Sequence, residues 1–570
     1  MPTNPRIRMR VWSGFFCALA LLLIARLYFV QIVHGEGYRA DALGQYVGTA
    51  AAETARGTIL FTQKDGTTVP AAVMQRGWRI AIVPKDLESA QGAYDTLNAI
   101  APIDKERFFS SAAKTDDPYE EVAFRLPFEA GAPIRTKKIP GVLLIQDTWR
   151  FYPGHDLAAH AIGFVGYKGD TKTGLYGLER EYQATLAQAN TGRAVNPFAE
   201  IFANISAALS FDPAAHEGNV ITTVEPTVQH QLEDILAEVS RTYSTRIAGG
   251  IVMDPKTGAI LAIAATPSFD PNAYNLQKDP GVFSNPLIEG RWEMGSIMKP
   301  LTLAAGIDTG AISLSTTYND TGCITRSGKK ICNFDFKARG VVPIQEILSQ
   351  SLNLGTTFVS EKMGHSVFAR YVQQFGFGTK TGIDLPNEVS GDIRALSGKS
   401  DVDFASASFG QGFAVSPIEM IRGLAILANE GAMPSPHIVS SIQYETGITR
   451  AVDIPKPTQV IKPASAETVT TMLVKVYDTA LLKGALKQEH YSIAAKTGTA
   501  QIGIPGGGGY YTDRYLHSFF GYFPAHDAKF IVFLFALEPH GVEYASASLA
   551  HPFGKLADFL IHYYNIPPDR

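Results

Sequence analysis

Three short motifs in the second half of this chain combine residue types that support nucleophilic catalysis. The first is a Ser-x-x-Lys pair, Ser296 and Lys299, in the stretch "EMGSIMKPLTLAAG". Proline is tolerated in a helix only near its start, so Pro300 predicts that a helix begins here. Residues three apart then share one face, which places the serine beside the lysine ammonium and near the positive end of the helix. Both effects favour an alkoxide, so Ser296 is a candidate nucleophile.

A Lys-Thr-Gly triplet is the second motif, and it occurs four times, with its lysines at Lys172, Lys256, Lys380 and Lys496. Polar or glycine- and proline-rich sequence surrounds the first three copies, which is typical of turns and loops. We predict a hairpin turn with a solvated amine at Lys256, and loops at Lys172 and Lys380.

The fourth copy lies in "YSIAAKTGTAQI", a strand-like stretch in which small residues flank the lysine. Small side chains on a strand let another backbone or a substrate come close. Thr497 and Thr499, separated by Gly498, point to the same face of a strand. Two hydroxyls and the Lys496 ammonium at one strand edge form a good receptor for a carboxylate.

The third motif is a Ser-x-Asn pair, Ser351 and Asn353, in "LSQSLNLGTTFV". A hydroxyl and an amide two residues apart, in a loop between helices, can both face a cleft. Further Ser-x-x-Lys matches begin at Ser111 and Ser327, but both have polar surroundings, and a single short match is weak support for a site.

Each motif also has a purely structural interpretation. Ser296 can be an N-cap, Ser351 and Asn353 can cap a helix, and Lys496 can be a strand-edge charge that discourages aggregation. In combination, the order Ser-x-x-Lys, Ser-x-Asn, Lys-Thr-Gly-Thr is the signature of enzymes that form an acyl-serine. We therefore predict one acylating site built from all three motifs.

Composition indicates the number of domains and limits the kinds of partner that the chain can bind. The chain has 570 residues, 45% hydrophobic and 18% charged, which predicts several globular domains with large cores. Its formal net charge is −4, and no basic run follows the first ten residues. We therefore predict no nucleic-acid partner.

The N-terminus indicates a membrane anchor. Arg6, Arg8 and Arg10 precede an apolar run over residues 11–33, long enough to span a bilayer. Basic residues on the short side predict a cytoplasmic N-terminus, with the rest of the chain outside the inner membrane. A cleaved signal peptide is less favoured because no small-x-small site follows the run. The third interpretation is a buried helix of a soluble domain.

Cys323 and Cys332 bracket "CITRSGKKIC", which is typical of two short strands around a Ser-Gly turn. A disulfide across this hairpin fits an oxidising compartment, and two reduced cysteines without a role are the equally weighted alternative. No Cys/His cluster accompanies them, which argues against a zinc site.

Patterning divides the exported part of the chain in two. Residues 34–220 contain short apolar runs such as "GWRIAIVPKDL" and "GVLLIQDTWRFYP", which predict an irregular β-rich module, and the segment around 192–218 resembles a linker. Beyond it, "TVQHQLEDILAEVSRTY" has the spacing of an amphipathic helix, and "GGIVMDPKTGAILAIAATP" that of a strand hairpin. The runs "LHSFFGYFPA" and "KFIVFLFALEP" predict two adjacent buried strands, with the glycine run before them forming a loop.

With these motifs the chain resembles a class B penicillin-binding protein, a membrane-anchored D,D-transpeptidase that cross-links peptidoglycan. The similarity extends to "RGTIL", "RFYPGHDLAAHAIGFVG", "GLEREY" and "SFGQGFAVSPIEM". The chain is most similar to the division-specific type, because Asn353 stands where elongation-specific relatives usually carry Asp. The closing "YYNIPPD" agrees with this.

The resemblance implies an α+β or α/β architecture in which an antiparallel sheet is flanked by helices and the nucleophile opens a central helix. It implies a cytoplasmic tail (1–10), a transmembrane anchor (11–33), a non-catalytic, dimerisation-like pedestal (34–220) and a transpeptidase domain (221–570). It places the enzyme in the inner membrane as a single-pass protein with a periplasmic catalytic domain. No metal or organic cofactor is expected.

The resemblance also implies a role for each site residue. Ser296 attacks the carbonyl between two terminal D-alanines, Lys299 accepts the serine proton, and Lys496 tunes the local field. Ser351 relays a proton to the departing D-alanine, and Asn353 binds the stem-peptide amide. Thr497 and Thr499 hold the terminal carboxylate, Gly498 is a further substrate-binding residue, and the N–H groups of Ser296 and Thr499 bind the oxyanion.

Expected partners are peptidoglycan stem peptides, β-lactams, a membrane glycan polymerase and other division proteins. The alternatives are an elongation-specific transpeptidase, a β-lactamase, a penicillin-sensing binding module, a bifunctional enzyme and an inactive scaffold. The large anchored N-terminal module argues against a β-lactamase, and a single apolar run argues against a sensor with several membrane spans. A bifunctional enzyme would need a helical glycosyltransferase domain, for which residues 34–220 show no pattern.

Overall fold

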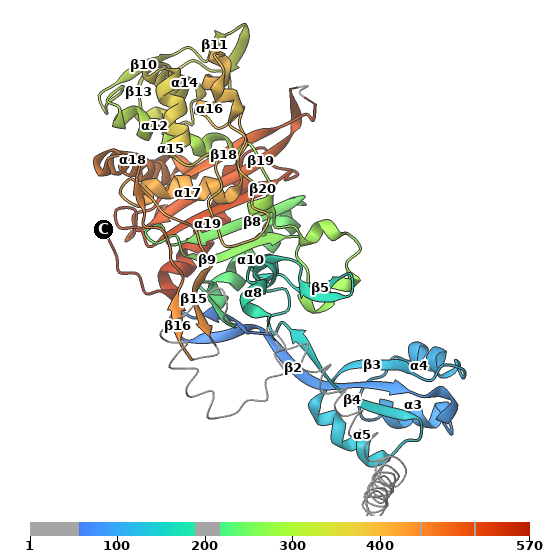
Figure 1. Cartoon of the computed structure of the whole chain (residues 1–570). Coiled ribbons are helices and arrows are strands. Elements are labelled where there is room, and N and C mark those ends of the chain that lie inside the picture. Colours follow the sequence, from blue (N-terminus) through green and yellow to red (C-terminus); the bar gives the residue numbers. More distant parts are fainter. Residues whose placement is uncertain (1–55, 188–216, 445–446, 507–508) are drawn as a thin grey trace, which may run out of the picture. The chain divides into compact units, whose positions relative to one another are not determined.

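The computed structural model describes residues 56–187, 217–444, 447–506 and 509–570 (Figure 1). The predicted tail, anchor and most of the linker lie outside these ranges. Within the ranges, no helix combines the length and hydropathy needed to cross a membrane. The described residues form two compact units, one of them Met74–Arg150, and the other comprising Gly57–Val73, Phe151–Ala187 and the rest of the chain to Arg570.

The smaller unit pairs three strands and covers them with short helices. Strand β2 (Thr68–Ile82), which begins in the larger unit, pairs with β3 (Glu120–Pro127) and β4 (Val142–Phe151). The helices are α3 (Ala90–Asn98), α4 (Lys105–Ala112) and α5 (Gly131–Lys137), with 3-10 turns η2 (Pro84–Asp86) and η3 (Phe128–Ala130). Trp78, Ile80, Leu97 and Phe108 are among the residues of its apolar core.

The β-rich prediction for this region is correct for β2 and β4 but missed the helices. Side-chain caps mark two of them: Ser89 accepts a hydrogen bond from the Gly92 N–H at the start of α3, and Asp104 accepts one from the Arg107 N–H at the start of α4. Such caps supply partners that the first N–H groups of a helix otherwise lack. Both helices are short, so each contains few apolar residues that could mark its periodicity.

The larger unit is built on a five-stranded antiparallel sheet of order β18-β19-β20-β8-β9. Its strands are β8 (Ile247–Met253), β9 (Ile260–Thr266), β18 (Ala494–Gly503), β19 (Tyr510–Phe523) and β20 (Phe530–Leu537). The predicted hairpin at Lys256 and the predicted pairing of the last two strands are confirmed. Every residue of β20 is buried, which explains its continuous apolar sequence.

Successive residues of β20 face two different cores. Phe533 packs into the core shared with the helices that surround the candidate site, and Leu534 packs against α10 (Pro226–Tyr243) and α19 (Ala545–Tyr563). The predicted buried face of α10 is confirmed by its residues Val228, Leu232, Ile235, Leu236 and Val239. The result is a three-layer arrangement, with helices on both faces of the sheet (Figure 1).

The second helical layer includes α17 (Pro417–Ala428), which is buried along its whole length and begins with a capping box formed by Ser416 and Glu419. Other helices of the larger unit are α6 (Ala159–Ile162), α7 (Gly177–Glu181), α8 (Gln183–Leu186), α11 (Pro286–Glu289), α12 (Lys299–Asp308), α13 (Gln345–Ser349), α14 (Asn353–Met363), α15 (His365–Gln374), α16 (Asp401–Ser408) and α18 (Pro463–Lys475). Short turns are η5 (Pro271–Leu276), η6 (Pro280–Phe283), η7 (Gly295–Met298), η8 (Arg394–Ser397), the π-turn η9 (Val476–Ala480) and η10 (Leu481–Gly484).

The remaining strands form small sheets at the periphery. Parallel pairing joins β1 (Ile59–Thr62) to β7 (Gly218–Thr222), and β7 pairs with β15 (Val439–Tyr444). The others are β5 (Val165–Lys168), β6 (Thr171–Gly174), β10 (Thr317–Asp320), β11 (Cys323–Arg326), β12 (Lys329–Cys332), β13 (Gly340–Pro343), β14 (Ala432–Met433), β16 (Thr449–Ala451) and β17 (Thr458–Gln459). The segments 57–73 and 151–187, which the sequence assigned to the pedestal, thus belong to the larger compact unit.

The loop predicted around Lys172 is wrong. Lys172 lies on β6, which pairs with β5 in a tight hairpin where Lys168 opposes Thr171. Gly169 has a φ of 62° in the connecting turn. A two-residue connection with a residue at positive φ closes a hairpin even when its strands are polar, so the polar sequence "TKTG" hid a strand.

Candidate active site

The candidate nucleophile lies at the start of a helix that contacts the edge strand of the sheet. Ser296 lies in η7, which runs directly into α12 with Pro300 in the first turn, as predicted. Gly295 before it has a φ of 65°, which favours glycine. Ser296 is partly exposed, and its hydroxyl makes no hydrogen bond within the described part of the chain. The hydroxyl is therefore free to meet a substrate.

Lys299 is fully buried beneath this serine, at 0% exposure. Its Nζ lies 2.5 Å from the Ser351 carbonyl oxygen, 2.8 Å from Asn353 Oδ1 and 3.2 Å from Ser351 Oγ. Burial, together with the charge of Lys496, lowers the pKa of Lys299 well below its ordinary value. The neutral amine has two N–H groups for the two carbonyl oxygens, which can only accept. Its lone pair is then left for a hydroxyl, as a general base requires.

Asn353 is held in the orientation that this arrangement needs. Its Nδ2 donates a hydrogen bond of 2.9 Å to the Cys332 carbonyl, so that Oδ1 faces Lys299. Ser351 has a φ of 56° in the turn between α13 and α14, and the turn is closed by a bond from the Leu352 N–H to the Ile347 carbonyl. A non-glycine residue in this region stores backbone strain, which often accompanies function.

Lys496 is the third member of a cluster with Lys299 and Ser351. It is 3% exposed, and its Nζ donates to Ser351 Oγ at 3.1 Å and to the Thr497 carbonyl at 3.0 Å. Burial lowers the pKa of Lys496 to about 7. The Ser351 hydroxyl therefore lies between two amines whose pKa values are both lowered, and each amine can exchange a proton with it.

Gly498 allows β18 to pass close to the nucleophile. A Cβ at this position would lie 2.4 Å from Ser518 Oγ, 2.7 Å from the Met294 carbonyl oxygen and 3.1 Å from the Ile297 nitrogen. A Cβ at Gly295 would likewise lie 3.0 Å from the Thr499 carbonyl oxygen. These contacts bring together the two backbone segments whose N–H groups are the predicted oxyanion donors.

Thr497 and Thr499 alternate with Lys496 and Gly498 along β18, and both are partly exposed. The hydroxyls therefore project from the opposite face of the strand to the lysine amine. Thr499 Oγ1 accepts a hydrogen bond of 3.1 Å from the Ala545 N–H at the start of α19. Sequence analysis missed this contact, because β19 and β20 separate the two residues along the chain.

The repeated motifs that were predicted to be structural lie elsewhere and have other partners. Ser111 Oγ donates to Glu120 at 2.9 Å, and Lys114 forms an ion pair with the same carboxylate at 2.7 Å. Lys256 pairs with Asp527, and its side chain is largely exposed. Ser327 lies in the turn of the cysteine hairpin, and Lys380 lies in a loop. The structure thus brings together one copy of each motif.

The question left open for the cysteines is answered by a disulfide between Cys323 and Cys332, which are cross-strand partners in the β11–β12 hairpin. The residue after Cys332 adds a second support. Asn333 is buried, its Oδ1 accepts from the Leu354 N–H at 3.2 Å, and its Nδ2 donates to both oxygens of Asp320 at 2.9 Å. Sequence analysis missed this support for the Ser351–Asn353 turn.

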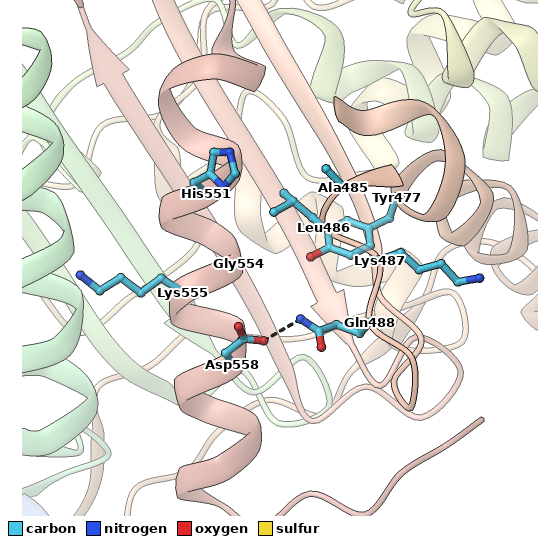
Figure 2. A pocket seen from close by; sticks show the side chains of 9 residues that line it. All are labelled: Tyr477, Ala485, Leu486, Lys487, Gln488, His551, Gly554, Lys555 and Asp558. Atoms are coloured by element: carbon cyan, nitrogen blue, oxygen red, sulfur yellow. Dashed lines mark hydrogen bonds between the residues drawn. The ribbon is translucent and has the colours of Figure 1, made fainter. Parts of the chain in front are cut away.

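A separate cavity of about 390 Å³ lies between residues 485–488 and α19 (Figure 2). Its lining includes Tyr477, His551 and Asp558, and Gln488 donates a hydrogen bond of 2.7 Å to Asp558. None of the predicted site residues lines this cavity. Among the residues that the structure describes, no cluster of three or more His, Cys, Asp or Glu side chains is arranged to hold a metal.

Comparison with known proteins assigns the fold and the cluster to a family. Residues 248–557, more than half of the 570, match the model of the penicillin binding protein transpeptidase domain, and the chain therefore belongs to this family. It is 26% identical to the penicillin-binding protein PbpB of Mycolicibacterium smegmatis over 97% of this chain and 90% of the relative. It is also 27% identical to the peptidoglycan D,D-transpeptidase FtsI of Escherichia coli over 76% of this chain and 71% of the relative.

Solved structures of penicillin-binding proteins superpose on this chain. Penicillin binding protein 3 of Mycobacterium tuberculosis, in an apo form, superposes with a TM-score of 0.64 at 26% identity, covering 74% of this chain and 92% of that one. The same protein complexed with aztreonam gives a TM-score of 0.67 at 23% identity, covering 90% of this chain and 97% of that one. Within the family, these relatives place the chain in class B.

Replacing Lys496 by methionine should move the pH dependence of acylation by a labelled penicillin. In the wild type, Lys496 is charged below pH about 7, and that charge lowers the pKa of Lys299. Without it the pKa of Lys299 rises, so the rate should begin to fall at a higher pH as the solution is acidified. Acylation rates between pH 5 and 9 measure this shift. Lys380→Met is the matched control, and an identical profile in Lys496→Met and wild type would contradict the assignment.

Removing the disulfide should slow acylation without abolishing it. In a Cys323→Ser/Cys332→Ser variant, the carbonyl that orients Asn353 is less well fixed, and a displacement of catalytic groups by about 1 Å can cost about 10²-fold in rate. Loss of a loop closure of this size should lower the free energy of unfolding by under about 3 kcal/mol. Acylation kinetics and thermal unfolding measure both effects, with Cys17→Ser as the control. Unchanged kinetics would show that the hairpin does not support the site.

Proposed function

We propose that this chain is a peptidoglycan D,D-transpeptidase that cross-links stem peptides through an acyl-serine intermediate. The observation that carries the proposal is the Lys299–Ser351–Lys496 cluster, in which one hydroxyl lies 3.2 and 3.1 Å from two buried amines with lowered pKa values. Such a pair can both remove a proton from Ser296 and return one to a leaving amine.

In the first step, neutral Lys299 accepts the proton of Ser296 while Oγ attacks the carbonyl between the two terminal D-alanines. The N–H groups of Ser296 and Thr499 bind the developing oxyanion. Collapse of the tetrahedral intermediate breaks the peptide bond, and the departing D-alanine amine takes its proton through the Ser351 hydroxyl. Thr497 and Thr499 hold the terminal carboxylate.

In the second step, the amine of a neighbouring stem peptide attacks the acyl-serine. Its proton passes to the Lys299–Ser351–Lys496 cluster, a new peptide bond forms, and Ser296 Oγ recovers its proton. A β-lactam enters the same first step, since its ring opens on attack by a serine, but it leaves no departing group and remains bound. Asn353, held by the Cys332 carbonyl, is placed to bind the stem-peptide amide.

The proposed setting is septal cell-wall synthesis, with residues 11–33 as a single inner-membrane anchor and the catalytic domain in the periplasm. Asn353, the closing sequence and the similarity to FtsI support the division role. A glycan polymerase in the membrane and other division proteins are the proposed partners. Localising a fluorescent fusion tests this role, because an elongation-specific enzyme would label the side wall instead of the division site.

The decisive test of the chemistry uses the full chain in detergent with a fluorescent penicillin, followed by a chase over hours and by mass spectrometry of the labelled peptide. A stable adduct on the peptide containing Ser296 is expected. Loss of label within minutes would assign the chain to the β-lactamases. No adduct on folded protein would overturn the proposal and leave a structural module. Purified stem peptides then provide a direct assay for cross-linked product.

A further inference from the structure

His517 is a buried polar residue beside the candidate site to which the proposed mechanism gives no role. It lies on β19 as the cross-strand partner of Thr499, at 0% exposure. Its Nδ1 is 2.8 Å from Ser548 Oγ, and its Nε2 is 3.1 Å from the Glu543 carbonyl oxygen. Both partners flank the start of α19, which begins at Ala545.

The two partners determine which ring nitrogen carries the proton. Burial lowers the pKa of His517 to about 4, so the ring is neutral at physiological pH and has a single N–H group. The Glu543 carbonyl can only accept, so Nε2 donates to it, and Nδ1 accepts from the Ser548 hydroxyl. The ring thus connects Glu543, two residues before the helix, to a residue in its first turn.

The start of α19 in turn determines the direction in which the Thr499 hydroxyl donates. The Ala545 N–H donates to Thr499 Oγ1 at 3.1 Å. A hydroxyl that accepts from a backbone N–H has its single proton free for another partner. Thr499 is partly exposed at the sheet edge beside the nucleophile, where the proposed function requires a donor for a substrate carboxylate.

We propose that His517 is a positioning residue for carboxylate recognition: it fixes the first turn of α19, so that the Ala545 N–H holds the Thr499 hydroxyl as a donor toward the substrate. The inference rests on the proposed function. It assigns no step of bond making to His517, and it predicts a loss confined to substrates that bear the carboxylate.

The experiment measures second-order acylation rate constants for benzylpenicillin and for its methyl ester, which lacks the charged carboxylate. In the wild type, the acid should react faster than the ester. In His517→Ala, the preference for the acid should fall by about tenfold, the scale of one hydrogen bond to a charged group, while the ester rate stays within twofold. His517→Gln retains an N–H that can reach the Glu543 carbonyl and should recover much of the preference.

Two further variants, Thr499→Val and Ser548→Ala, test whether His517 acts on the substrate through the first turn of α19 and the Thr499 hydroxyl. Thr499→Val should lose the acid preference by itself, and adding His517→Ala should cause little further loss, because both changes remove the same interaction. Ser548→Ala, which removes one ring partner, should give a smaller loss in the same direction and serves if His517→Ala does not fold. His551→Ala, on the exposed side of α19, is the matched control and should behave as wild type.

The outcomes separate the two proposals. Equal losses for acid and ester in His517→Ala would mean that the histidine only supports the fold, and no loss in either would mean that it has no role; both overturn this inference while leaving the proposed function intact. If the wild type reacts with neither penicillin, the proposed function fails and this inference fails with it. Independent losses in the Thr499→Val/His517→Ala double variant would also overturn it.

Discussion

A Ser296→Ala variant is expected to form no covalent adduct with a labelled penicillin under conditions in which the wild type is labelled completely. The hydroxyl is the atom that the acyl group must occupy, whereas Ser351 Oγ already lies within hydrogen-bond distance of two amines. Because Ser296 makes no hydrogen bond to the described residues, its removal should change the free energy of unfolding by no more than about 0.5 kcal/mol. In-gel fluorescence and thermal unfolding measure both quantities.

The chain supplies its own controls for this experiment. Ser111→Ala and Ser327→Ala remove the serines of the other two Ser-x-x-Lys matches, and both variants should be labelled as fully as the wild type. Labelling that survives in Ser296→Ala but disappears in either control would move the nucleophile to that position. Residual labelling of Ser296→Ala beside full labelling of both controls would indicate that the probe also reacts at a site outside the motifs.

Lys299→Met should have the second largest effect, a loss of about 10²- to 10⁴-fold in the acylation rate, the usual contribution of a general base. Methionine has a similar length and fills the buried site without the amine. Since burial and the Lys496 charge lower the pKa of Lys299, the neutral base persists in the wild type to lower pH than an ordinary lysine would allow. The wild-type rate should therefore fall with acidification only below that lowered pKa, and this limb should be absent from the variant.

Initial rates of labelling at a series of pH values check both the loss in acylation rate and the absence of the decrease in rate at low pH. Lys114→Met and Lys330→Met are matched controls, because they remove the lysines of the other two Ser-x-x-Lys matches. A Lys299→Met variant that keeps the wild-type rate, or that keeps the same acid limb, would show that another group accepts the serine proton. Lys496 would then be the first candidate, given its pKa of about 7.

Features that depend on near neighbours in the sequence could be predicted. The helix at Pro300, the buried face of α10 and the β19–β20 pair follow from local patterning, and the structure has each of them. The three motifs were also recognisable in sequence, because each packs its chemistry into four residues or fewer. Their local context separated Lys496 from the three other copies of the triplet.

Features that depend on distant neighbours could not be predicted. The Cys332 carbonyl orients Asn353, and the Ala545 N–H holds Thr499, but a backbone group carries no side-chain signature in the sequence. The role of His517 could not be predicted either, since a single histidine in an apolar strand has no sequence pattern that separates it from other buried residues. The hairpin at Lys172 was missed because its strands are polar, and periodicity of apolar residues is the main signal for a strand.

The close contact at Gly498 has a consequence for how this enzyme can evolve under antibiotic selection. Any side chain at this position would clash with the Met294 carbonyl and the Ser518 hydroxyl, because β18 and the segment that carries the nucleophile are already in close contact there. Resistance that depends on a reshaped cleft must therefore arise at the partly exposed positions around it, such as Thr497 and Thr499. Under the proposed function those positions also bind the natural substrate, so each gain in resistance would be coupled to a loss in cell-wall synthesis.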